Sequence, residues 1–299
     1  MNADDPNPDK PNWIGIIVAA VFTIPAQALL AFLLITVEFR DKKPPIPRVA
    51  LSTPNAELLL HYPPEVPLAW DFVTVPGGCF TQGLDTIAVI SAKPAHEVCV
   101  SAFRMSRYEV TRHQWFAVMG REHPEQALAA PNHPAASVSW LEAYKFIQKL
   151  NKMTGWSARF PTESEWEYAC RSGGRDERYC GGDEADTVAW SIGESHGIVQ
   201  RVGGKKPNAL GLFDMSGNVA EWVWDRFAPH YYAVSPRDNP QGPHYGDSGV
   251  VGNERVIRGA SAGDPRTQMH ANTRWHQPAG YIPRRTGLRI VRPVEEESE

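Results

Sequence analysis

The longest apolar stretch of the chain lies near its N-terminus, where residues 13–37 read WIGIIVAAVFTIPAQALLAFLLITV. As a helix this segment would span roughly 37 Å, more than the ~30 Å hydrocarbon core of a bilayer. We therefore predict a transmembrane helix at residues 13–37, in contact with the membrane lipid bilayer and preceded by an N-terminal tail, residues 1–12. A cleaved signal peptide is the alternative, because Ala26-Gln27-Ala28 resembles a cleavage site. The run is longer than a signal core, which favours an uncleaved anchor.

The remainder of the chain divides into three parts by composition. Residues 38–67 are rich in proline, which predicts a stiff, extended linker. Residues 68–293 are expected to form one globular domain, because no second linker interrupts them. Residues 294–299 contain four glutamates and predict a solvated acidic tail.

Within the domain, the apolar pattern changes repeatedly between short strand and helix signals. β-Branched and aromatic runs bounded by glycine or proline predict strands at residues 71–75, 96–103, 255–259 and 287–291. Capping boxes, Ser or Thr followed three residues later by Glu, open helices at residues 140–153 and 163–171, and Thr111 caps a third at 112–119. Long stretches rich in Gly, Pro, Trp and Asn separate these elements. The pattern predicts an irregular α+β domain.

Composition and charge narrow the class of protein. Hydrophobic residues make up 42% of the chain and the formal net charge is −4, so a globular protein is expected and a nucleic-acid partner is not. Basic residues are more frequent after the apolar segment than before it, which places the domain in the cytoplasm by the positive-inside rule. The four cysteines, an even number in two close pairs, favour an oxidising compartment instead.

Five ordered sequence blocks carry a resemblance to a known family. They are Val75-Pro76-Gly77-Gly78, Arg107-Tyr108-Glu109-Val110-Thr111, residues 134–143, residues 159–169 and residues 208–222, followed by Arg255-Val256-Ile257-Arg258-Gly259 and Gly287-Leu288-Arg289. In this order they resemble the formylglycine-generating enzyme (sulfatase-modifying factor) domain. The resemblance implies a C-type-lectin-like fold with little regular secondary structure, in agreement with the sparse strand and helix signals.

A calcium site is expected in the fifth block. Asp214 and Glu221 are seven residues apart around Gly217-Asn218, and such a turn can gather oxygen ligands for a hard cation. The spacing alone leaves a purely structural turn open. In the family, the positions of Asp214, Gly217, Val219 and Glu221 bind calcium through two side chains and two backbone carbonyls, so the resemblance implies Ca²⁺ here.

The catalytic chemistry of the family is not expected in this chain. Family enzymes oxidise a substrate cysteine with copper bound by two cysteines, and thiolates suit Cu(I). At those positions this chain has Asp264 and Met269, and no cysteine follows Cys180; no copper is expected. The remnant of the active-site cleft is predicted to comprise Ser261, Asp264, Arg266, Met269, His270, Arg274, Trp275 and His276. A metal at His270 and His276 is the alternative to their being ordinary surface or packing residues.

Two disulfides are predicted. Cys79 and Cys99 fall in successive strand signals that can pair, and Cys170 and Cys180 close a short glycine-containing segment. Four reduced thiols are the alternative. The bridges favour an extracytoplasmic (periplasmic) domain on a single-pass membrane protein, with a cytoplasmic domain as the alternative.

These features together predict a membrane-anchored, non-catalytic domain of the family. Such a domain would serve as a regulatory or accessory module for a protein partner or an integral membrane complex. The competing hypothesis is a metal-dependent oxidoreductase or protein-modifying enzyme with a non-standard active site.

Overall fold

A computed structural model describes residues 70–86, 92–120, 131–245, 247, 249–250 and 252–294. The predicted transmembrane helix at 13–37, the linker at 38–67 and residues 295–299 of the acidic tail lie outside this part of the chain. Among the described residues, no helix has the length and apolar character needed to cross a membrane.

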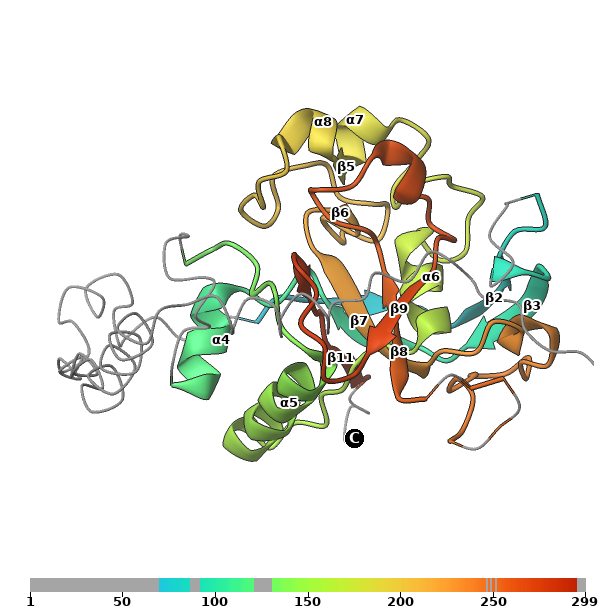
Figure 1. Cartoon of the computed structure of the whole chain (residues 1–299), viewed down its shortest axis with the longest axis horizontal. Helices are drawn as coiled ribbons and strands as arrows, with labels where there is room; N and C mark the ends of the chain where they lie inside the picture. The colour runs from blue at the N-terminus through green and yellow to red at the C-terminus, as the bar shows by residue number, and fades with distance from the viewer. Residues whose placement is uncertain are drawn as a thin grey trace, which may run out of the picture. The chain divides into compact units, whose positions relative to one another are not determined.

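The described part is a mixed α and β structure in which most elements are short (Figure 1). The helices are α4 (Arg112–Met119), α5 (Trp140–Thr154), α6 (Glu163–Cys170), α7 (Ala185–Val188) and α8 (Ile192–Ser195). The strands are β1 (Phe72–Val75), β2 (Gly78–Gln82), β3 (His96–Val100), β4 (Phe103–Ser106), β5 (Ala189–Trp190), β6 (Ser216–Gly217), β7 (Ala220–Arg226), β8 (Glu254–Arg258), β9 (Trp275–Pro278), β10 (Thr286–Gly287) and β11 (Val291–Pro293). The predicted α+β class with little regular structure is confirmed.

Four small sheets connect distant parts of the chain. Their strand orders are β10-β7-β8-β9, β1-β4-β11, β2-β3 and β5-β6. In the largest sheet, β8 pairs antiparallel with both β7 and β9, whereas β10 adds parallel to β7. Strand β4 lies between β1 and β11 and pairs antiparallel with both. The end of the domain therefore lies in the same sheet as its beginning.

The predicted helix starts are confirmed by their caps. Ser139 and Thr162 each accept a backbone N–H through the side chain, from Glu142 and Glu165 respectively, and each glutamate accepts the backbone N–H of its capping residue. These reciprocal bonds satisfy donors that a helix N-terminus leaves free. Helix α5 ends at Gly155, whose φ of 74° is the left-handed conformation that glycine adopts without a Cβ clash.

Helix α6 is buried along its whole length. It contacts the β2–β3 pair as well as β7 and β8 of the largest sheet (Figure 1). The apolar core around it includes Val98, Phe103, Trp166, Met215 and Val223. A second core packs one face of α5 against β7 and β8 through Phe146, Leu150, Trp222, Ile257 and Leu288.

Glu163 and Glu167 of α6 pair with arginines from near the end of the sequence, whereas Glu165 pairs with the nearby Arg159. Arg258 donates to Glu163 at 2.7 Å and to Glu167 at 2.8 Å, and Arg274 donates to Glu163 at 2.6 Å. Burial opposes the charge on Glu163, but the two guanidinium groups hold its pKa below the usual range. Glu163 and Glu167 are therefore buried as members of ion pairs rather than as isolated charges.

Both predicted disulfides are present. Cys79–Cys99 joins β2 to β3, with Cα atoms 3.9 Å apart, and Cys170–Cys180 joins the end of α6 to the loop that follows, with Cα atoms 4.5 Å apart. All four cysteines of the chain are therefore paired. Disulfides persist in oxidising compartments, so their presence points to an oxidising environment for the domain.

Candidate functional site

Three interior carboxylates form the first candidate site. Glu109 lies between β4 and α4, Asp214 precedes β6, and Glu221 is on β7. Their exposed fractions are 1%, 2% and 0%. Burial, and next the negative charges of the other two groups, raise the pKa of Glu109 well above its usual range. Burial also raises the pKa of Asp214 to about 6.

The three groups differ in how well they are satisfied. Arg289 donates to both oxygens of Glu221, at 2.7–2.9 Å, and the Trp166 indole N–H donates to Glu221 Oε2 at 2.7 Å. Asp214 Oδ2 accepts the Gly203 N–H at 2.5 Å. By contrast, Asp214 Oδ1 and both Glu109 oxygens are buried without a well-formed hydrogen bond, although the Val219 N–H and the Trp190 side chain lie near enough to lower the pKa of Glu109 and Asp214, respectively. Buried carboxylate oxygens that are so poorly satisfied are rare, which makes them candidate ligands for a cation.

This donor set fits a hard cation only in part. Such carboxylate oxygens are ligands that Ca²⁺ accepts, and two of the three groups supply them. However, the ligand atoms of the three carboxylates do not all lie within 4.8 Å of one another. Among the described residues, the group of His, Cys, Asp or Glu side chains that meets this distance is Cys79, Glu97 and Cys99. Calcium at the carboxylates would therefore require side-chain movement. The sequence did not lead us to expect Glu109 as a ligand. The available signal was that it is an acidic residue within the block 107–111 that resembles the family.

Asp264 and Met269, the positions expected from the sequence to match the family's redox cysteines, have structural roles here. Asp264 Oδ2 accepts the Ser261 N–H at 2.8 Å and the Ser261 hydroxyl at 2.7 Å, which closes a tight turn after β8. Met269 is 1% exposed and packs in a small core with Tyr179 and Ala189. One position therefore caps a turn and the other fills an apolar interior.

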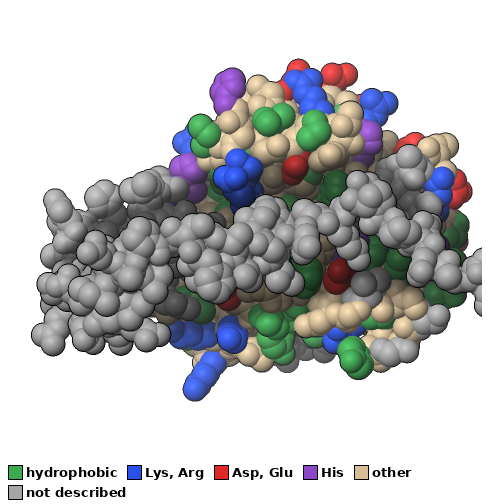
Figure 2. Space-filling model, in the orientation of Figure 1, with side chains coloured by type: hydrophobic (Ala, Val, Ile, Leu, Met, Phe, Trp, Pro, Cys, Tyr) green, Lys and Arg blue, Asp and Glu red, His purple; other side chains and the backbone are tan. Residues whose placement is uncertain are grey.

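The remaining predicted cleft residues point in different directions. Arg274 is buried and donates to Glu163. A buried carboxylate without a paired cation would be strongly destabilising. Arg266 lies at the surface and pairs with Asp186 and Glu194, in the region of α7 and α8 where both signs of charge mix (Figure 2). The structure thus separates residues that are close in sequence.

The other three predicted cleft residues lie at or near the surface. Trp275 and His276 are exposed on β9, and the His276 ring stacks on Phe227 at 3.6 Å between centroids. His270 contacts Tyr179 edge-on and lines a cavity of about 280 Å³ with Arg171 and Asp183 among others. Burial, and next the nearby Arg178, lower the pKa of His270. His270 and His276 are therefore in different surroundings.

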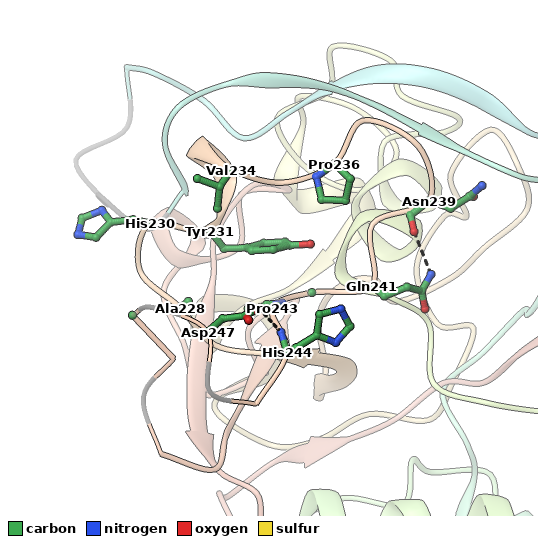
Figure 3. A pocket seen from close by; sticks show the side chains of 12 residues that line it. Ala228, His230, Tyr231, Val234, Pro236, Asn239, Gln241, Pro243, His244 and Asp247 are labelled. Carbon is green, nitrogen blue, oxygen red and sulfur yellow. Dashed lines mark hydrogen bonds between the residues drawn. The ribbon is translucent and has the colours of Figure 1, made fainter.

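A larger cavity, about 600 Å³, lies in the segment between β7 and β8. In Figure 3 the Tyr231 ring occupies its middle, with Val234 and Pro236 on one side and Gln241 and His244 on the other. Sequence reasoning did not identify this cavity, because it depends on how an irregular loop folds back on itself.

The wall of this cavity depends on a glycine at position 242. Gly242 has a φ of 77°, and a Cβ added there would lie 2.7 Å from the Asp225 side chain. Only glycine fits this close approach. Asp225 is itself buried, and burial, followed by the charge of Glu163, raises its pKa to about 8.

Comparison with known proteins identifies the domain. Residues 62–294 match the family described as the sulfatase-modifying factor enzyme 1-like domain. The chain belongs to this family. The resemblance drawn from the five sequence blocks is thereby confirmed.

Relatives of this sulfatase-modifying factor domain have varied names. The formylglycine-generating enzyme of Streptomyces coelicolor is 36% identical over 167 residues, which cover 49% of this chain and 49% of that enzyme. Chaperone protein LppX of Paenibacillus barcinonensis is 28% identical over 207 residues, 52% of this chain and 71% of that protein. Serine/threonine-protein kinase pkn1 of Chlamydia pneumoniae is 25% identical over 258 residues, 78% of this chain and 39% of the kinase. The match thus spans about half of the Streptomyces enzyme and less of the kinase.

Solved structures share the fold of the sulfatase-modifying factor domain. PvdO from Pseudomonas aeruginosa superposes with a TM-score of 0.64 at 25% identity, covering 76% of this chain and 95% of PvdO. Treponema denticola variable protein 1 superposes with a TM-score of 0.66 at 24% identity, covering 75% and 95%. The irregular architecture of Figure 1 is therefore a known one.

Proposed function

We propose that this protein is a non-catalytic member of the sulfatase-modifying factor family that binds a protein partner at a membrane surface. The observation that carries the proposal is the state of the two positions that match the redox cysteines. Asp264 is committed to the turn with Ser261, and Met269 is buried in an apolar cluster. Neither side chain can act as a thiolate ligand for copper.

The cysteines that the chain does contain do not replace the missing pair. Cys170 and Cys180 are buried in the core around α6. Cys79 and Cys99 lie on β2 and β3, which differ from the segment between β8 and β9 that contains the matched positions. All four are in disulfides, so no thiolate pair is present in the oxidised protein.

The names of the relatives support a binding role. One is called a chaperone protein and others are called protein kinases, so the domain occurs in proteins named for functions other than formylglycine generation. Fold similarity alone does not transfer an activity. The 600 Å³ cavity, with an aromatic ring, amides and histidines, offers a surface where a peptide segment can bind.

In this proposal calcium has a structural role. Glu109 and Asp214 would bind the cation through their poorly hydrogen-bonded oxygens, together with the predicted set of Gly217, Val219 and Glu221. A divalent cation would offset the buried negative charge of these carboxylates. It would thereby fix the turn at residues 214–221, and it takes part in no reaction step.

The proposed location is extracytoplasmic, with residues 13–37 as the anchor. The disulfides support this side of the membrane, and the predicted transmembrane helix supports the attachment. Full-length protein should sediment with membranes and resist extraction by carbonate. A variant in which residues 13–37 are removed should stay in the supernatant; equal sedimentation of both proteins would refute the anchor.

The decisive test of the non-catalytic role is a thiol-oxidation assay. Purified protein is incubated with Cu(I), oxygen and a cysteine-containing peptide; the mass of the peptide and the copper retained by the protein after desalting are measured. We expect no aldehyde product and no stoichiometric copper binding. The double variant Asp264→Cys, Met269→Cys serves as the comparison, since it restores two thiols at the matched positions and should gain copper binding. Copper-dependent oxidation by the unmodified chain would overturn the proposal.

A further inference from the structure

The two disulfides of this protein have opposite surroundings. Cys170 and Cys180 are 0% and 4% exposed and belong to the core around α6. Cys79 is exposed and Cys99 is half-buried, and they face each other across the antiparallel pair of β2 and β3 at one side of the domain (Figure 1). A thiol from solution can therefore reach Cys79–Cys99 but not Cys170–Cys180.

Charged side chains polarise the exposed bridge. The Nη2 atom of Arg237 lies 3.7 Å from Cys79 Sγ, whereas Glu97 Oε1 lies 3.9 Å from Cys99 Sγ. A cation beside a sulfur stabilises its thiolate, and a carboxylate beside it does the opposite. Cys79 is consequently the better leaving group of the two.

The arginine is held at this position by the backbone around it. Cys99 donates its N–H to the Arg237 carbonyl at 2.7 Å, and the Asn239 N–H donates to the Cys99 carbonyl at 2.8 Å. The guanidinium group also pairs with Glu97 at 2.6 Å and with Asp238 at 2.9 Å. These contacts fix Arg237 to the edge of β3, so its charge stays close to the bridge.

From these contacts we propose that Cys79–Cys99 is a reversible thiol-exchange site for low-molecular-weight thiols. An external thiolate attacks Cys99 Sγ, forms a mixed disulfide there and breaks the Cys79–Cys99 bond. The bonding electron pair leaves on Cys79 as a thiolate beside Arg237. A second external thiolate then attacks the mixed disulfide, releases Cys99 as a thiolate and forms the disulfide of the external thiol. The protein gains two electrons, and two external thiols are oxidised.

The strand pairing makes the exchange reversible. Gly78–Gln82 pairs in register with His96–Val100, so the ladder keeps the two sulfurs facing each other when the bridge is open. Re-oxidation then needs no search through other conformations. The Cys170–Cys180 bridge provides an internal reference in every experiment, because it shares the protein but not the exposure.

Mass spectrometry of the folded full chain tests the site. Native protein is treated with reduced glutathione, quenched with acid, blocked with N-ethylmaleimide and digested. We expect Cys79–Cys99 to open while Cys170–Cys180 stays closed, with glutathione on Cys99 and maleimide on Cys79. Arg237→Gln should slow opening, because a thiol of higher pKa leaves more slowly. A rise of about one unit in that pKa gives about threefold, when the leaving thiol is assigned a slope of the same size as the ~0.5 of the attacking thiol.

Arg266→Gln is the matched control, because Arg266 is also exposed and also pairs with two carboxylates. It should leave the rate of opening unchanged. Three results would each overturn the proposal. They are equal opening of both bridges, equal glutathione on Cys79 and Cys99 in the unmodified protein, and equal slowing by Arg237→Gln and Arg266→Gln. Circular dichroism of each variant verifies that the fold is retained.

Discussion

Calcium should stabilise the domain through Glu109, and the effect can be measured as a shift in melting temperature. The structure buries two oxygens of Glu109 and one of Asp214 without well-formed hydrogen bonds. Because a cation that binds only the folded state adds RT ln(1 + [Ca²⁺]/Kd), calcium at about one hundred times its Kd contributes about 2.7 kcal/mol. For a domain of this size the melting temperature should rise by about 5–10 °C.

The variant Glu109→Gln separates a ligand from a purely structural carboxylate. In chelator the variant should be at least as stable as the unmodified protein, because a neutral amide removes the electrostatic cost of a buried acid. With calcium it should lose most of the stabilisation. Glu184→Gln, at an exposed position near α7, makes the same charge change away from the cluster and should keep the full calcium response.

Differential scanning fluorimetry in calcium and in EDTA measures both effects. If the unmodified protein melts at the same temperature in both solutions, calcium does not bind these carboxylates, and their poor hydrogen bonding has another cause. A full calcium response in Glu109→Gln would remove Glu109 from the ligand set and leave only the positions expected from the sequence. A comparable response to Mg²⁺ would argue against a calcium site, because Mg²⁺ requires a tighter, octahedral set of ligands.

Three further predictions concern the scaffold. Burial and the Glu163 charge raise the pKa of Asp225 to about 8, from about 3.9 in an unfolded chain. Between these values the folded state binds one more proton than the unfolded state. The free energy of unfolding should therefore fall by up to about 1.4 kcal/mol per pH unit as the pH rises from about 4 to 8. Asp225→Asn should flatten this slope in urea titrations, and an unchanged slope would exclude Asp225 as its source. Arg258→Leu removes the buried cation shared by Glu163 and Glu167 and should cost about 3–5 kcal/mol in denaturant unfolding; a loss below about 1 kcal/mol would contradict the role of the network. Ser139→Ala removes the α5 cap and should cost about 1 kcal/mol, whereas an unchanged unfolding midpoint would show that the cap is dispensable.

Local features of the fold could be predicted from the sequence because their causes are local. A capping box joins residues three positions apart, so Ser139 with Glu142 and Thr162 with Glu165 indicated two helix starts correctly. The Cys79–Cys99 bridge followed from two successive strand signals. These predictions needed only the order of residues within short segments.

Contacts between distant segments could not be predicted in this way. Arg258 and Arg274, which pair with Glu163 of α6, follow it by 95 and 111 residues, and no local pattern selects them. The residues of the predicted cleft differ in their surroundings for the same reason. They are neighbours in sequence, yet a turn, an apolar cluster and an exposed strand direct them to different places.

The buried ion network shows how the segment between β8 and β9 is held in a chain that has no cysteine after Cys180. Arg258 and Arg274 bracket the segment that contains the two matched positions, and both are anchored on α6 by Glu163. The path of the segment is thus fixed at its two ends by the arginines, and within it by the Asp264 turn and the packing of Met269. Breaking the buried arginine network should cost about 3–5 kcal/mol. The arginines therefore hold this part of the family fold in a chain with no cysteine there, which agrees with the proposed binding role.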